Sequence, residues 1–107
     1  MSNANNLAFS EPQLALAERF LAAYNAIDRH LREVMRQPNH RGFSSLVREY
    51  GAHHARWLDL DGHRLFAFAD LRNVLVHNKL EPYRYLAIPL PEVVEAIEAI
   101  RDHLLDP

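Results

Sequence analysis

The sequence predicts an all-α domain: an antiparallel bundle of about four helices, with an extended segment before the last helix. Apolar residues recur at spacings of three and four along most of the chain, and prolines and glycines separate these periodic stretches. The length of 107 residues fits one domain, since domains commonly contain about 100–150 residues. We therefore expect a flexible N-terminus over 1–9 and a single helical domain over 10–107.

The first helix is expected to begin after Ser10. Pro12 is tolerated in a first turn, and Gln13 stands three residues after the cap, as in a capping box. An apolar stripe of helical period then continues to about Arg36, and Pro38 ends it. The stripe consists of Leu16, Phe20, Tyr24, Ile27, Leu31, Val34 and Met35.

A second helix is predicted from Ser44 or Ser45 to about Arg56. The stretch 57–63 is interpreted as a connection, in which Asp61 is a candidate N-cap for the third helix.

The third helix is predicted over 62–79, and Pro82 stops it. The stretch 83–89 is then expected to be extended, and the final helix to begin at Pro91. The final helix is predicted from the periodic residues Val93, Val94, Ile97, Ile100 and Leu104.

On a helical wheel, one arc of the third helix is expected to face the core. The arc contains Ala67, Phe68, Leu71, Val74 and Leu75. Polar residues on the other side are interleaved with Leu65, Phe66, Ala69 and Val76. A helix that is apolar almost all round is normally buried on more than one side. The second side could be covered by another helix or by a second subunit in a homodimer.

The polar residues of this helix that could carry chemistry are Arg72, Asn73 and His77. Histidine can transfer a proton to or from a ribose hydroxyl at neutral pH, and arginine can stabilise charge on a phosphate. Arg72 and His77 are five residues apart and point in different directions on one helix, so a second copy would help them to share a ligand. The combination indicates RNA cleavage without a metal.

The segment 71–78, with Arg72, a polar Asn73 and then His77, resembles the motif of the HEPN domain family. Members are small helical bundles that usually dimerise through the helix that carries the motif. Many are metal-independent endoribonucleases of toxin, antiphage or RNA-processing systems, and others only bind. The resemblance implies that Arg72 and His77 are catalytic, that Asn73 supports them, and that no cofactor is needed. It implies RNA as substrate and a cognate antitoxin or a fused sensor domain as further partner.

The chain departs from one branch of the family. In toxins paired with a nucleotidyltransferase antitoxin, a tyrosine follows the histidine by two positions, and here that position is Lys79. The stretch 69–107 also resembles HEPN segments that precede CBS-pair domains, so the chain could be part of a longer protein.

Beside the motif, Lys79, Tyr83, Arg84 and Tyr85 could contact RNA, since tyrosine stacks on bases and cationic side chains bind phosphate. The alternative is an extended segment that packs one tyrosine against the bundle. Likewise, Arg72, Asn73 and His77 could simply tie two helices together, which would make the domain a catalytically silent binding or sensor module.

A second polar cluster could suggest a metal site, because His and Asp are common ligands of divalent ions. It contains His53, His54, Asp59, Asp61 and His63. A helical HxxxH pair is missing, and the later acidic ligands of a calcium loop are absent, so we expect no metal site.

Composition limits the remaining function classes. The chain has no cysteine, which excludes thiolate catalysis and disulfides, and its net charge of -2 argues against a strong non-specific DNA binder. No stretch approaches the roughly 18 consecutive apolar residues of a membrane span, and the N-terminus does not resemble a secretory signal. We expect a cytoplasmic protein without membrane contact.

Overall fold

A computed structural model describes residues 9–36, 41–76 and 85–106, and these residues form helices joined by non-helical segments. No strand occurs among them, which confirms the all-α helical bundle. The helical elements are α1 (Glu11–Met35), α2 (Phe43–His53), α3 (Ala55–Trp57), the π-helical turn η1 (Leu58–Gly62), α4 (Arg64–Leu75) and α5 (Pro91–Leu105). The expectation for the N-terminal segment falls, apart from Phe9, outside the described residues.

Helix α1 begins and ends where the sequence predicts. The Gln13 amide donates to Ser10 Oγ over 3.3 Å, and the Ser10 amide donates to Gln13 Oε1 over 2.8 Å, which completes the capping box. The helix ends at Met35, because Arg36 takes the left-handed conformation with φ 55°. One residue of the predicted stripe, Val34, is 50% exposed and does not belong to the core.

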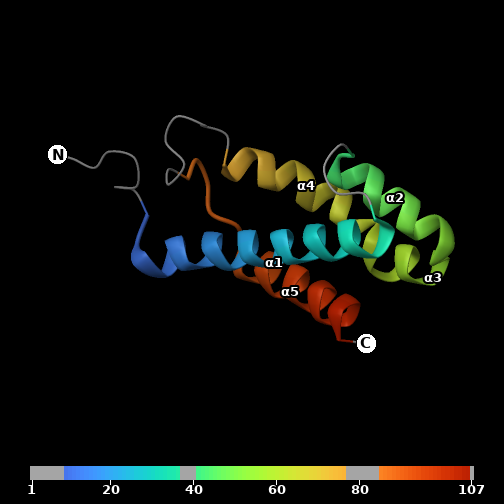
Figure 1. The fold of residues 1–107 in the computed structure, drawn as a ribbon. Coiled ribbons are helices and arrows are strands. Elements are labelled where there is room, and N and C mark those ends of the chain that lie inside the picture. Colours follow the sequence, from blue (N-terminus) through green and yellow to red (C-terminus); the bar gives the residue numbers. More distant parts are fainter. Residues whose placement is uncertain (1–8, 37–40, 77–84, 107) are drawn as a thin grey trace.

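Helix α1 is the central element, against which α2, α4 and α5 pack (Figure 1). Helix α4 runs opposite to α1, and α5 returns in the direction of α1 (Figure 1). The core is apolar, and all of these helices contribute to it. Its largest fully buried side chains are Phe20, Ile27, Leu31, Leu46, Leu65, Leu75, Ile97 and Ile100.

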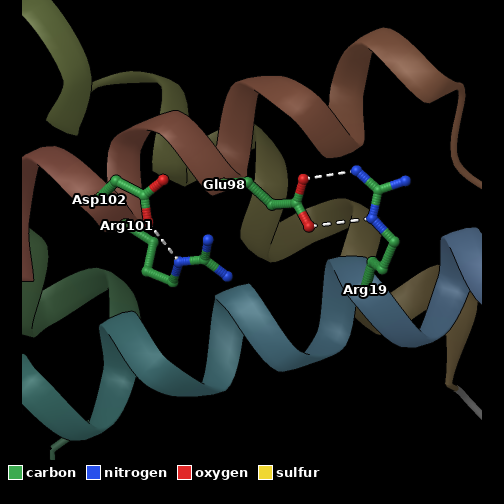
Figure 2. A network of polar contacts seen from close by, with 4 residues as sticks. All are labelled: Arg19, Glu98, Arg101 and Asp102. Atoms are coloured by element: carbon green, nitrogen blue, oxygen red, sulfur yellow. Dashed lines mark hydrogen bonds and ion pairs between the residues drawn. The ribbon is translucent and has the colours of Figure 1, made fainter.

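An ion pair joins α1 to α5 at the edge of this core. Figure 2 shows Arg19 and Glu98 pointing toward each other from the two helices. The Arg19 guanidinium donates from Nε to Glu98 Oε2 over 3.0 Å and from Nη2 to Oε1 over 2.6 Å. These hydrogen bonds lower the pKa of Glu98 and raise that of Arg19. Beside them, Arg101 donates to its neighbour Asp102 over 2.9 Å (Figure 2).

The predicted connection over 57–63 is wrong, because this stretch is helical in α3 and η1. Gly51 and Gly62 allow α2, α3 and η1 to pack tightly against one another. A Cβ on Gly62 would lie 2.6 Å from Cζ3 of Trp57, and one on Gly51 would lie 2.9 Å from Cδ1 of Leu58. These glycines therefore let α2, α3 and η1 approach closely rather than marking a loop.

The sequence predicts Asp61 as the N-cap of the third helix, but in the structure Asp61 does not cap it. The N-cap of α4 is His63, which makes no side-chain capping bond. Asp61 lies inside η1, and its Oδ2 is 3.3 Å from Nδ1 of His103 on α5. The residue thus connects η1 to the last helix instead of starting α4.

Helix α4 is shorter than predicted, since it begins at Arg64 and ends at Leu75 instead of reaching Lys79. Val76 leaves the helical conformation, with φ -127° and ψ 64°, while its amide still donates to Arg72 O. After the gap in the described chain, the Leu86 amide donates to Leu75 O over 3.2 Å. The described part of the predicted extended segment is non-helical up to Leu90, and α5 begins at Pro91 as predicted.

None of the helices described above has both the length and the apolar character that crossing a membrane requires.

Candidate functional site

The structure describes three of the seven predicted site residues, namely Arg72 and Asn73 on α4 and Tyr85 before α5. The other four predictions lie outside the described residues. They concern His77, Lys79, Tyr83 and Arg84. The described part of the candidate site therefore centres on Arg72 and the residues around it.

Arg72 lies on the inward face of α4, contrary to the predicted wheel. The buried residues of α4 are Leu65, Phe68, Ala69 and Leu75. At about 100° per residue, Arg72 falls in the middle of their arc. Two residues of the predicted core arc, Ala67 and Val74, are exposed, Val74 by 54%.

This orientation follows from the long side chain of arginine. The methylene groups of arginine can lie along apolar neighbours while the guanidinium reaches a polar place at the edge of the core. Arg72 is half-buried, whereas the adjacent Asn73 points outward and is exposed. Helix α4 therefore presents an inward cation and an outward amide next to each other.

The Arg72 guanidinium is held by an aromatic ring and an amide. Its Cζ lies 6.0 Å from the centroid of the Tyr24 ring on α1, within the range of a cation–π contact. Its Nη1 donates to Asn73 Oδ1 over 3.4 Å. None of the described carboxylates pairs with Arg72, in contrast to Arg19 and Arg32, which both have carboxylate partners.

Tyr24 is a buried and uncharged residue against which the Arg72 guanidinium lies. It is buried, and its ring stacks on Phe43 of α2 with the centroids 4.3 Å apart. Burial raises the pKa of its hydroxyl to about 12, although the charge of Arg72 acts to lower it. Tyr24 is therefore protonated at neutral pH, and it contributes a ring face and a neutral hydroxyl.

A carboxylate lies one helical turn further along α1. Asp28 Oδ2 accepts from Arg32 Nε over 3.1 Å, and Arg32 Nη1 donates to the carbonyl oxygen of Arg41 over 2.7 Å. The other oxygen, Asp28 Oδ1, is buried and has no hydrogen-bond partner among the described residues. The ion pair with Arg32 thus occupies one side of the carboxylate and leaves the other side as an unused acceptor.

Tyr85 approaches the N-terminal half of α1. It is half-buried, and burial raises the pKa of its hydroxyl, with a further increase from the charge of Glu18. Tyr85 is therefore partly shielded from solvent and lies near the charge of Glu18 on α1.

Two of the three histidines of the second polar cluster make contacts within their own helical segments. His54 Nδ1 donates to Tyr50 O over 3.0 Å, and His63 Nδ1 donates to Leu58 O over 3.2 Å. No group of three or more potential ligands in the described ranges is arranged to hold a metal ion.

Sequence reasoning missed Tyr24 and Asp28 as members of the site. The signal that could have found them is the spacing of Tyr24, Asp28 and Arg32 by four residues along α1. Three polar-tipped side chains on one stripe of an amphipathic helix indicate a polar seam within the bundle.

Comparison with protein-family models, curated proteins and solved structures gives no match to this chain.

Proposed function

We propose that this chain is a metal-independent endoribonuclease of the HEPN type, in which Arg72 stabilises the phosphate and His77 acts as general acid and base. The observation that carries the proposal is the state of Arg72. Arg72 is half-buried, its guanidinium is held by Tyr24 and Asn73, and no carboxylate in the described part of the chain pairs with it. A cation that is positioned but not neutralised is suited to charge that develops on a phosphate.

The proposed reaction breaks the bond between phosphorus and the 5′ oxygen of the next nucleotide. The 2′ hydroxyl gives its proton to the base and attacks the phosphorus, and the leaving 5′ oxygen takes up a proton. The products are a 2′,3′-cyclic phosphate and a 5′ hydroxyl. His77 can carry both protons because imidazole titrates near neutral pH, and Arg72 stabilises the charge on the non-bridging oxygens. Asn73 would orient Arg72 through its amide oxygen.

A homodimer is part of the proposal. The outward face of α4 carries Asn73 together with two exposed apolar residues, Ala67 and Val74. Exposed apolar side chains suit contact with a second copy, and such a contact would bring the two Asn73 side chains to the interface. The RNA strand is proposed to be held beside the site by Lys79, Tyr83, Arg84 and Tyr85. The protein is proposed to be cytoplasmic, with its activity controlled by an antitoxin or a fused sensor domain.

The experiment is cleavage of a labelled RNA in EDTA by the wild type and by His77→Ala, with the product ends identified by mass spectrometry. We expect cyclic phosphate ends from the wild type and no product from His77→Ala. Equal cleavage by His77→Ala would refute the role of the histidine, and an inactive wild type would refute the nuclease itself.

Mixing two inactive variants tests the shared site. If Arg72 and His77 act from different subunits, Arg72→Met and His77→Ala together recover roughly a quarter of wild-type activity, because half of the dimers are mixed and each has one intact pair. Recovery of none would show that both residues act from the same copy.

A second candidate is a catalytically silent binding or sensor module. The inward orientation of Arg72 favours it, because the contact with Tyr24 also ties α4 to α1. In that case Arg72→Met lowers the stability of the fold, and no RNA is cut by any variant.

A further inference from the structure

Arg72 can act on a phosphate only if its surroundings fix the guanidinium without neutralising it. Resting on the function proposed above, we infer that Tyr24 is a positioning residue for Arg72. We infer further that the Asp28–Arg32 ion pair keeps the guanidinium available to an RNA phosphate. Helix α1 would thus contribute a support to a site whose reacting groups come from the motif.

Tyr24 is suited to this role because its ring cannot move easily. The side chain is 8% exposed, and its ring lies against Phe43 at 4.3 Å and Phe20 at 6.3 Å between centroids. The ring holds Arg72 through its π face, and such a contact leaves the charge of the cation intact. A carboxylate in the same place would bind Arg72 more firmly but would compete with phosphate for it.

Such a carboxylate is close at hand in Asp28. The charges of Asp28, Arg32 and Arg72 all act on the Tyr24 hydroxyl, so the four groups share one neighbourhood. Arg32 holds Asp28 at 3.1 Å and is itself fixed by the carbonyl of Arg41 at 2.7 Å. Because Asp28 Oδ1 is buried without a partner among the described residues, removal of Arg32 would leave this carboxylate without its cation, and Arg72 is the other cation that acts on the same Tyr24 hydroxyl.

The first test uses the free protein and needs no RNA. The Nε–H signal of Arg72 in an NMR spectrum should be shifted upfield by the ring current of Tyr24. We expect Tyr24→Phe to keep this shift and Tyr24→Leu to abolish it. Phe68→Leu is the matched control, since Phe68 is equally buried and lies 6.0 Å from the guanidinium of Arg64 on the same helix. It should change the signal of Arg64 and leave that of Arg72 in place.

The second test measures the affinity for a 2′-O-methyl RNA oligonucleotide, which cannot be cleaved, by fluorescence anisotropy. Tyr24→Phe should bind within about twofold of the wild type, because the ring remains. Tyr24→Leu should lose at least about tenfold, as expected for a displaced charge-assisted contact, and should match Arg72→Met. Phe68→Leu, which tests for general loosening of the core, should bind like the wild type.

The role of the ion pair is tested by removing Arg32. Arg32→Gln should weaken binding more than Arg29→Gln, which removes an equal charge from the exposed side of α1. Addition of Asp28→Asn to Arg32→Gln should restore affinity, because the competing carboxylate is then gone. A double variant that binds no better than Arg32→Gln would overturn this part of the inference.

The outcomes separate the two proposals. If the wild type binds RNA through Arg72 but Tyr24→Leu binds equally well, the positioning role is wrong and the proposed function stands. If the ring-current shift is present but neither the wild type nor any variant binds RNA, the proposed function is refuted. The inferred role of Tyr24 in phosphate binding is then refuted as well. An Arg72 signal without a ring-current shift overturns the positioning role directly.

Discussion

Substitution of Gly62 by alanine should destabilise the fold, because the structure leaves no room for a Cβ at this position. The added Cβ would lie 2.6 Å from Cζ3 of the Trp57 ring and 3.0 Å from Cδ1 of Leu58. A rigid indole must then move within a packed region, and such overpacking typically costs about 1–3 kcal/mol. Alanine also favours helical backbone over glycine by up to about 1 kcal/mol, which offsets part of this cost. We expect a net loss of roughly 1–2 kcal/mol.

The assay is thermal and urea unfolding followed by circular dichroism. For a domain of this size, the loss corresponds to a decrease in Tm of roughly 5–15 °C. Gly51→Ala should have a smaller effect, since its Cβ would meet the terminal methyl groups of Leu58, which can rotate away. Gly42→Ala is the control without a clash, because nothing lies within 4 Å of its Cβ position. If Gly62→Ala is as stable as Gly42→Ala, the close packing of η1 on Trp57 is refuted.

Three further predictions concern the contacts of α1. Arg72→Met should raise the pKa of Tyr24 above its value of about 12 in the wild type, since the charge of Arg72 lowers this pKa. An alkaline titration followed by tyrosine absorbance measures it, and an unchanged pKa would contradict the contact between Arg72 and Tyr24. Arg19→Met should lower the free energy of unfolding at neutral pH. This loss of stability relative to the wild type should shrink as the pH falls through the lowered pKa of Glu98, because Glu98 of the wild type is then protonated and loses its ion pair. Urea unfolding midpoints of both proteins at pH 7 and in acid measure the difference. Ile27→Ala should cost about 2–5 kcal/mol in urea unfolding, because Ile27 is fully buried and the change leaves a cavity.

The elements with strong local signals were predictable from the sequence. Helix α1 begins at the Ser10 cap and ends before Arg36, and α5 begins at Pro91, because caps and prolines act through neighbouring residues. The stretch 57–63 was misread as a connection because Asp61 was taken as the N-cap of the third helix and Gly62 as its first residue. In the structure this glycine serves the contact with Trp57, which depends on tertiary packing.

The candidate site was predictable in part. Arg72 and Asn73 were found from the sequence, but the direction of Arg72 was not. A wheel ranks residues by polarity, and it therefore placed the arginine outside and Val74 inside, whereas α4 is rotated so that Leu65 and Ala69 are buried. The contribution of Tyr24 comes from a helix more than forty residues earlier, and no local pattern connects it to Arg72.

The most direct test of the proposed function is the single-turnover rate of RNA cleavage in EDTA by Arg72→Met compared with Arg64→Met. Both arginines belong to α4, and each guanidinium lies 6.0 Å from an aromatic ring, so the two variants lose the same kind of contact. If Arg72 stabilises the phosphate, Arg72→Met should cleave at least about 100-fold more slowly than the wild type. Arg64→Met should remain within about threefold, as expected for a surface residue away from the reaction. Equal rates for the two variants would contradict the assignment of Arg72.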